Sequence, residues 1–125
     1  MNPQVVLATL IGILLLACST IASPSASPSE GVFDAKWGTE GTGVGQFYQP
    51  GDVAVASDGS VYVADTFNHR IQKFTSAGVF VSQWGTEGEG TEEFGWPSGV
   101  AVASDGSVYV ADTVNSRIQN FSPGP

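Results

Sequence analysis

The 125-residue sequence predicts an all-β fold, in which two four-stranded antiparallel blades of a partial β-propeller follow an N-terminal apolar signal or anchor helix. Two observations predict the blades. Residues 31–77 recur as residues 78–124 with about 30 of the 47 aligned positions identical, which marks a repeat architecture. Each repeat also holds four short apolar or alternating runs between turn-forming residues. A period of about 40–50 residues with four strands is typical of one propeller blade.

Residues 1–18 are expected to be an export signal or a membrane anchor. Residues 5–22 carry no charge and are mostly apolar, a run at the short end of what crosses a bilayer. Leu15-Leu16-Ala17-Cys18 resembles the lipobox of bacterial lipoproteins, which implies lipidation of the Cys18 thiol and cleavage before it. Because residues 1–4 lack the Lys or Arg usual in a signal peptide, a cleaved non-lipid signal, an uncleaved anchor and a start-site artefact stay open as alternatives. The expected location is the extracytoplasmic side of a membrane.

Residues 19–30 are rich in Ser, Pro and Ala, and such a composition cannot bury a core. This segment is expected to link the membrane to a folded body at residues 31–125. That body consists of two repeats, at 31–77 and 78–124.

The first repeat unit is expected to form strands at residues 52–56, 61–65, 70–74 and 79–84. Its first two strands are joined by Ser57-Asp58-Gly59-Ser60, in which Asp-Gly supplies the positive φ that a tight hairpin needs. The second unit repeats this pattern up to its third strand. Residues 31–37 match the fourth strand and stand alone ahead of the first repeat, so we expect them to form a separate outer strand.

The signature of the repeat is long and occurs twice. The run Val53-Ala54-Val55-Ala56-Ser57-Asp58-Gly59-Ser60-Val61-Tyr62-Val63-Ala64-Asp65-Thr66 recurs unchanged at residues 100–113. With the Asn-x-Arg-Ile-Gln-x-Phe that follows shortly in both copies, it resembles the NHL repeat over about three quarters of the chain. The resemblance implies a propeller, usually of six blades, that binds proteins, glycans, small ligands or, in tripartite-motif relatives, RNA.

Six polar residues occupy matching positions in the two repeats: Asp65, Asn68, Arg70, Asp112, Asn115 and Arg117. An Asp at a strand end can accept hydrogen bonds from the following turn and pair with an Arg a few residues on. Because a catalytic site would depart from the repeat, these residues are interpreted as a structural signature. Asp58 and Asp105 are interpreted as turn formers. No catalytic residue is predicted, and the chain is expected not to be an enzyme.

Binding residues are expected where the two repeats differ. In propellers, the loop that enters a blade and the loop between its second and third strands lie on the same face. Here these loops are residues 38–51, 66–69, 85–99 and 113–116, and their candidate binding residues are Tyr48, Gln49, Phe67, His69 and Trp96. Tyr48 and Trp96 are suited to stacking on a ligand or filling a partner's pocket; packing between blades is the alternative.

Composition excludes several classes of function. A net charge of −8 with four Lys and Arg opposes nucleic-acid binding, which needs a basic surface. A single cysteine excludes an intramolecular disulfide and a cysteine-based zinc cluster. His69 is the sole histidine and is expected to be an exposed loop residue, so neither metal nor cofactor is predicted. The second long loop is acidic, and its four glutamates are interpreted as solvent-exposed surface residues; binding of a cationic partner or Ca²⁺ is the alternative. These residues are Glu87, Glu89, Glu92 and Glu93.

Two blades do not close a ring, since propellers need about four to eight. One interpretation is that three copies form a six-bladed ring, each lending residues 31–37 to its neighbour through a heterologous interface. The other is that the sequence is a fragment of a larger NHL-propeller protein, related to the lyases built on such propellers. The expected function is a non-enzymatic extracytoplasmic binding module, tethered at the cell envelope, for an unknown protein, glycan or small ligand.

Overall fold

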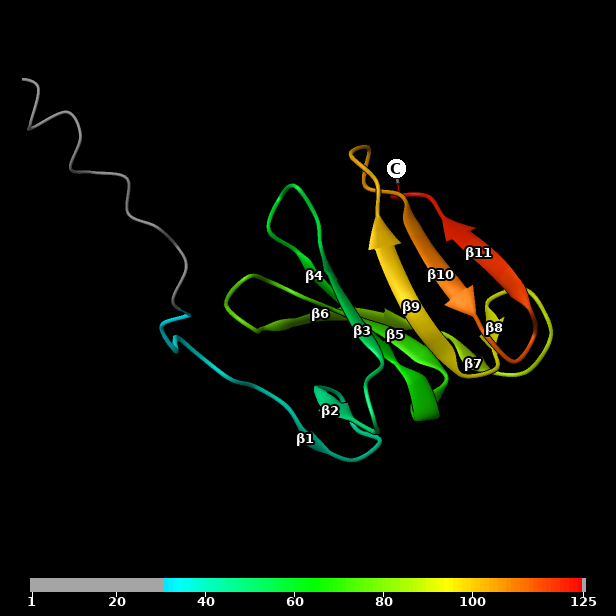
Figure 1. The fold of residues 1–125 in the computed structure, drawn as a ribbon, viewed down its shortest axis with the longest axis horizontal. Coiled ribbons are helices and arrows are strands. Elements are labelled where there is room, and N and C mark those ends of the chain that lie inside the picture. The colour runs from blue at the N-terminus through cyan, green and yellow to red at the C-terminus, as the bar shows by residue number, and fades with distance from the viewer. Residues whose placement is uncertain (1–30, 125) are drawn as a thin grey trace, which may run out of the picture. The chain divides into compact units, whose positions relative to one another are not determined.

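The structure is a computed structural model that describes residues 31–124, drawn as a ribbon in Figure 1. The predicted signal or anchor with its Cys18, and the predicted linker at 19–30, lie outside the described residues. Residues 31–34 belong to one unit and have no regular secondary structure, whereas every described strand lies in the unit that begins at Ala35. Among residues 31–124, no helix has the length and hydrophobicity needed to cross a bilayer.

The first blade is a four-stranded antiparallel sheet in the order β3-β4-β5-β6, as the sequence predicts. Its β3–β4 hairpin turns at Asp58-Gly59, where the Asp58 carboxylate accepts a hydrogen bond from the Ser60 N–H at 2.8 Å. Gly59 has a φ of 88°, which glycine adopts without steric cost. Two strand ends lie one residue inside the predicted bounds; the strands are β3 (Asp52–Val55), β4 (Val61–Asp65), β5 (Arg70–Phe74) and β6 (Phe80–Trp84).

The second blade has three strands within the described residues, in the order β9-β10-β11. They are β9 (Pro97–Val102), β10 (Val108–Asp112) and β11 (Arg117–Phe121). The prediction of a separate strand at residues 31–37 is wrong for the chain taken alone, because these residues form no strand. A strand is held by hydrogen bonds to a neighbouring strand, and no described strand of this chain pairs with them. One edge of β11 is therefore unpaired in the part of the chain that is described.

Two short parallel bridges, which the sequence did not predict, fold the long loops back on themselves. β1 (Thr39–Glu40) pairs with β2 (Gln46–Phe47), and β7 (Thr86–Glu87) pairs with β8 (Glu93–Phe94). Each strand is two residues long, too short to show an alternating pattern. A 3₁₀ turn, η1 (Thr66–Asn68), joins β4 to β5.

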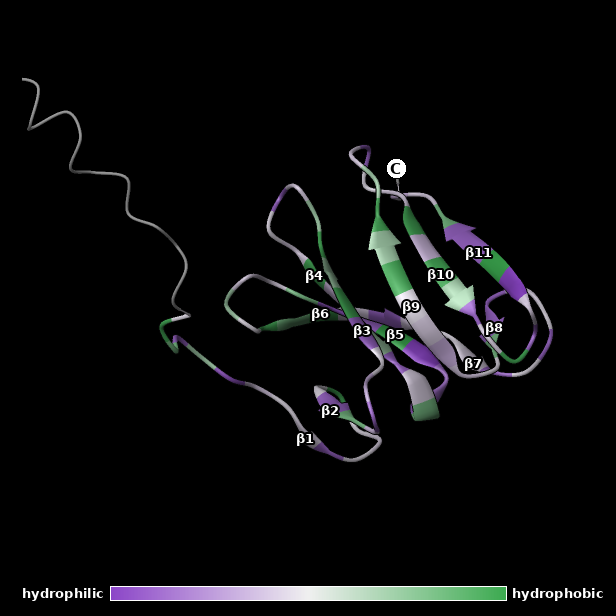
Figure 2. Cartoon of the chain, viewed as in Figure 1, coloured by the Kyte–Doolittle hydropathy of each residue, from purple (hydrophilic) through white to green (hydrophobic). Residues whose placement is uncertain are grey.

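The main hydrophobic core lies between the two blades. Hydrophobic residues are concentrated in the strands (Figure 2), and one face of each sheet contributes to this core. The buried members are Tyr62, Ala64 and Ile71 from blade 1 and Phe94, Val100, Val108 and Val110 from blade 2 and its entry loop. A smaller core lies on the other face of blade 1, where Val61, Val63 and Phe74 pack with Phe47 and Phe80.

Candidate functional site

The loops that carry the candidate binding residues lie at one end of the blades. Because neighbouring strands are antiparallel, the segments before β3 and β9 emerge at the same end as the β4–β5 and β10–β11 turns. Figure 1 shows the β1–β2 and β7–β8 bridges at the lower end of the view and the β3–β4 and β9–β10 hairpins at the upper end. We call the lower end the long-loop face; it comprises residues 38–51, 66–69, 85–96 and 113–116.

Three aromatic side chains from three separate segments meet on this face. The Phe67 ring centroid lies 5.4 Å from that of Tyr48 and 5.3 Å from that of Trp96, and tilted rings at such separations attract one another. We call these three residues the aromatic cluster. Tyr48 is 42% exposed and Trp96 is 50% exposed. Both residues therefore pack on Phe67 and still present an exposed surface; the contact of Trp96 with Phe67 joins the two blades, whereas that of Tyr48 lies within blade 1.

His69 and Gln49 are placed differently from the aromatic cluster. The His69 side chain is largely buried, and its Nδ1 lies 3.1 Å from the Phe94 carbonyl oxygen, which accepts a hydrogen bond when Nδ1 is protonated. The expectation of an exposed His69 is wrong, because the ring joins the β4–β5 turn to the loop that enters blade 2. Gln49 is exposed and lines a groove with Trp37 and Phe47.

A buried polar network, which we call the brace, ties the first long loop to blade 1. The buried Asp65 carboxylate accepts hydrogen bonds from the Tyr48 backbone N–H at 2.8 Å and from Arg70 Nε at 2.7 Å. Asn68 Nδ2 donates to the same carboxylate at 3.0 Å and to the Gly41 carbonyl oxygen at 2.9 Å. Arg70 also donates to three loop carbonyl oxygens at 2.8–2.9 Å, those of Thr42, Gly43 and Gln46.

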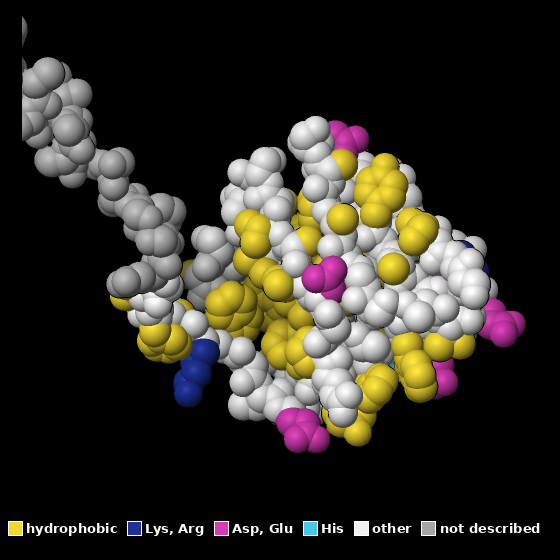
Figure 3. All heavy atoms as spheres, in the orientation of Figure 1, with side chains coloured by type: hydrophobic (Ala, Val, Ile, Leu, Met, Phe, Trp, Pro, Cys, Tyr) yellow, Lys and Arg dark blue, Asp and Glu magenta, His cyan; other side chains and the backbone are white. Residues whose placement is uncertain are grey.

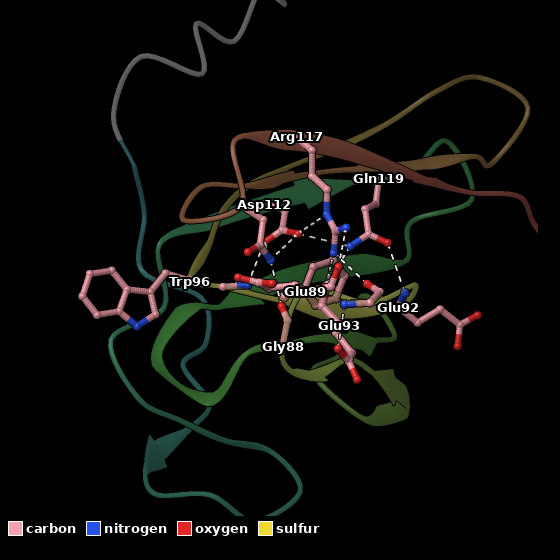
Figure 4. Close-up of polar contacts among 12 residues, drawn as sticks. Gly88, Glu89, Glu92, Glu93, Trp96, Asp112, Arg117 and Gln119 are labelled. Atoms are coloured by element: carbon pink, nitrogen blue, oxygen red, sulfur yellow. Dashed lines mark hydrogen bonds and ion pairs between the residues drawn. The ribbon is translucent and has the colours of Figure 1, made fainter.

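Blade 2 has a second brace built from the matching residues, drawn in Figure 4. Asp112 accepts hydrogen bonds from the Gly95 backbone N–H and from Arg117 Nε, both at 2.7 Å. Asn115 Nδ2 donates to the Gly88 carbonyl oxygen at 2.8 Å. Arg117 donates to the carbonyl oxygens of Glu89, Gly90 and Glu93. The six repeated polar residues thus hold the two long loops in matching conformations.

The two braces differ in exposure. The Arg70 side chain is 9% exposed, whereas the Arg117 side chain is 34% exposed. In blade 1, β6 lies beside the arginine and supplies Gln83, whose Oε1 accepts a hydrogen bond from Arg70 at 3.0 Å. Within the described residues, β11 has no such neighbour. The first brace is therefore the more strongly desolvated of the two.

The hydrogen bonds around Asp112 lower its pKa. Burial raises the pKa of this carboxyl, but the hydrogen bonds from the Gly95 backbone, Asn115, Arg117 and Gln119 outweigh that effect and hold the pKa below its usual value. The group is therefore a fixed carboxylate at neutral pH. Its acceptor positions are taken by protein donors, so it is suited to support a loop rather than to exchange protons with a substrate.

Gln72 and Gln119 complete the braces, a role that the sequence interpretation missed. Gln72 Nε2 donates to the Gln46 carbonyl oxygen at 2.7 Å and to Asp65 at 3.0 Å, and its Oε1 accepts from the Gly45 N–H at 3.0 Å. Gln119 binds the Glu93 carbonyl oxygen and Asp112 in the same way. The available signal was their recurrence at matching positions on strands, where a buried amide needs partners.

The acidic residues of the second long loop do not gather into one site. Glu93 Oε2 accepts a hydrogen bond from the Gly90 N–H at 2.7 Å, so this residue shapes the loop. Glu87 is largely exposed and lies 4.0 Å from His69 Nε2 through its Oε2 atom. Among residues 31–124, no group of three or more His, Cys, Asp and Glu side chains is arranged to hold a metal ion.

Comparison with known proteins agrees with this geometry. The family model for the NHL repeat matches the chain twice, at residues 47–74 and 94–121. The matches begin at Phe47 of β2 and Phe94 of β8, and they end at the last residues of β5 and β11. The chain is also similar to the B-box type zinc finger protein ncl-1 of Caenorhabditis elegans, with 49% identity over 43 residues. That match covers 34% of this chain and 5% of the relative, so this chain corresponds to only a small part of the relative's length. The chain carries two NHL repeats.

Proposed function

We propose that this chain is a non-enzymatic binding module whose ligand packs on the aromatic cluster. The observation that carries the proposal is the meeting of Tyr48, Phe67 and Trp96 from three segments on the long-loop face, with the outer two rings about half exposed. Exposed aromatic side chains held in place supply large contact area at low cost in conformational entropy. Such residues are enriched among those that dominate binding energy.

The braces support the proposal because they hold the backbone of the two loops that carry Tyr48 and Trp96. The Tyr48 backbone is held by Asp65, and the Gly95 backbone, next to Trp96, is held by Asp112. In Figure 4 the Trp96 ring points away from the network that holds its loop. A binding group on a rigid support loses little freedom when a ligand arrives. The repeated polar residues thus act as scaffold for the residues at which the repeats differ.

The chemistry of the cluster favours a ligand with a flat apolar surface. A sugar ring, a proline or an aromatic side chain of a partner protein, and a small planar molecule all stack on such rings. The exposed Glu87 beside His69 and the net charge of −8 favour a neutral or cationic ligand over an anionic one. These features support a protein, glycan or small-molecule partner and oppose a nucleic acid.

We further propose that the module is exported and tethered on the extracytoplasmic side of a membrane. The support is the uncharged run at residues 5–22 and the lipobox-like Leu15-Leu16-Ala17-Cys18. A lipid on the Cys18 thiol would anchor the module. Measuring the mass of the mature N-terminus, together with membrane fractionation, tests this: a chain that begins at a lipidated Cys18 supports the tether, and a chain without lipid that is recovered outside the membrane fraction refutes it.

The binding proposal is tested by probing the full chain against an array of glycans and synthetic peptides. We expect Trp96→Ala and Tyr48→Ala to lose the binding that the unmodified chain shows. Val79→Ala is a matched control, because Val79 is an exposed apolar residue in the β5–β6 turn, at the opposite end of the blade. Unchanged binding by Trp96→Ala, or binding by no probe at all, would contradict the proposal.

A further inference from the structure

Each blade packs one face against the other blade of the chain, and among residues 31–124 no blade covers its second face. We call the side with Tyr62 and Ile71 in blade 1 the back face, and the side with Val100 and Val110 in blade 2 the front face. Within the chain, the back of blade 1 packs on the front of blade 2. Among the described residues, no blade covers the back of blade 2 or the front of blade 1.

The free back face of blade 2 repeats the residues that are buried in blade 1. A shift of 47 positions takes Tyr62 to Tyr109 and Ile71 to Ile118. Ile71 is 0% exposed, whereas Ile118 is 66% exposed, and Tyr109 is exposed as well. Figure 3 shows exposed hydrophobic side chains on the viewed side of the molecule. Within residues 31–124, the side chains that form one half of an interface in blade 1 are thus left without a partner in blade 2.

The free front face of blade 1 shows the complementary relation. Val53 is 57% exposed, whereas its counterpart Val100 is 7% exposed in the core between the blades. Val55 is exposed too, while its counterpart Val102 packs against that core. The front of blade 1 therefore offers the surface on which a back face packs elsewhere in the chain.

Trp37 packs on the front face of blade 1 and forms part of the surface that a partner would contact. Its counterpart Trp84 packs on Phe121 of the next blade and on Tyr62 of its own, with centroids 5.4 and 6.2 Å apart. Trp37 already packs on Phe74, the counterpart of Phe121, at 6.1 Å. The third ring of the Trp84 arrangement is Tyr62, and its counterpart in blade 2 is the exposed Tyr109. Trp37 thus holds one half of an interface that the chain builds in full around Trp84.

We infer that a second copy of this chain packs the back of its blade 2 on the front of blade 1, continuing the interface between the blades. In this arrangement Tyr109 of one copy meets Trp37 of the other, and residues 31–37, which align with 78–84, are placed along the free edge of β11. Such a front-to-back interface is heterologous, and it closes into a ring when it repeats the rotation that relates neighbouring blades of a closed propeller. Closed propellers contain about four to eight blades, so a ring holds two to four copies. This inference does not depend on the aromatic cluster or its ligand.

The copy-to-copy interface is weaker than the internal one at identifiable positions. Inside the chain, Asp52 Oδ2 accepts a hydrogen bond from the Val100 backbone N–H at 3.0 Å across the blades. The counterpart of Asp52 in blade 2 is Gly99, which has no side chain to offer. Likewise Ser116 replaces His69, whose ring contacts Phe94 across the internal interface. The assembly is therefore expected to dissociate into folded chains before the two blades of a chain separate.

The test is native mass spectrometry of the full chain released from nonionic detergent, which counts the copies directly. We expect one ring stoichiometry of two to four copies. Ile118→Lys alters only a back face and Val53→Asp only a front face, so each variant alone is expected to be monomeric. Because both sites are more than half exposed in the single chain, neither substitution disturbs the packed core. Val44→Lys is the matched control: Val44 is 59% exposed and lies in the first long loop, and this variant is expected to assemble normally.

Mixing the two face variants separates this arrangement from other modes of association. Ile118→Lys keeps an intact front face and Val53→Asp keeps an intact back face, so the mixture is expected to give a 1:1 heterodimer and nothing larger. That heterodimer would also show that both variants are folded. The inference is overturned if the unmodified chain is monomeric at every soluble concentration, if the single variants still assemble, or if their mixture forms no heterodimer.

Discussion

Removal of the aspartate is predicted to damage the two braces unequally. Asp65→Ala deletes the acceptor for the Tyr48 N–H and for Asn68, Arg70 and Gln72. It leaves the Arg70 guanidinium, whose side chain is 9% exposed, without its counter-charge. Breaking a buried ion pair by removing one partner costs about 3–5 kcal/mol. This is a large part of the total stability of about 5–15 kcal/mol that is typical of a small domain.

The matching substitution in blade 2 is expected to cost less. Asp112→Ala removes an equivalent set of hydrogen bonds, but the Arg117 side chain is 34% exposed and water can solvate its charge. Loss of the hydrogen bonds then dominates, at about 1–3 kcal/mol. The expected difference between the two variants is therefore about 2 kcal/mol, with Asp65→Ala the less stable.

Urea unfolding followed by tryptophan fluorescence, at one fixed chain concentration, measures this difference. If Asp65→Ala has no folded baseline, Asp65→Asn and Asp112→Asn provide the comparison, since asparagine keeps an acceptor for the loop N–H. Equal losses of unfolding free energy in the two blades, or a larger loss in blade 2, would refute the reasoning from burial.

The remaining predictions concern a turn, a titration and a metal. Gly106 has a φ of 90° in the β9–β10 hairpin, so Gly106→Ala is expected to lower the unfolding free energy by about 1–2 kcal/mol; an unchanged urea midpoint would count against the turn assignment. Because the pKa of Asp112 is lowered in the folded state, its stabilising contribution is present above its unfolded pKa and is lost as pH falls through the folded one. The stability gap between the unmodified chain and Asp112→Asn is therefore expected to shrink below about pH 4, and a gap that widens there would reverse the sign of this argument. A lyase-related module would hold a metal, whereas this chain is predicted to hold none. EDTA treatment is therefore expected to leave the urea midpoint unchanged; a lowered midpoint, with metal found by elemental analysis, would favour the enzyme alternative.

Much of the fold was predictable because the repeat supplies two independent copies of each signal. Asp58-Gly59 and its second copy predict the hairpins, and the short apolar runs predict the strands to within a residue in blade 1. The parallel bridges were not predictable, since two paired residues leave no periodic pattern. The strand expected at residues 31–37 is absent for a different reason: a strand needs a neighbour, and the sequence of one chain does not show where that neighbour comes from.

The residues of the candidate site could be predicted from the sequence more fully than their contacts and burial. Comparing the repeats selected Tyr48, Phe67 and Trp96, and the structure brings these three together. The burial of His69 depends on a contact between loops 25 residues apart in sequence, which no local pattern encodes. The role of Gln72 was hidden for a similar reason, because its partners are loop carbonyl and N–H groups rather than recognisable side chains.

The central claim is that repeated polar residues build the scaffold while the residues that differ between repeats carry binding. It is tested most directly by measuring binding and urea unfolding on the same two variants, Trp96→Ala and Arg117→Ala, against the glycan and peptide array. We predict that Trp96→Ala abolishes binding and keeps the unfolding midpoint, because its ring is half exposed, whereas Arg117→Ala lowers the midpoint. A Trp96→Ala chain that is as destabilised as Arg117→Ala and still binds its ligand would contradict the account.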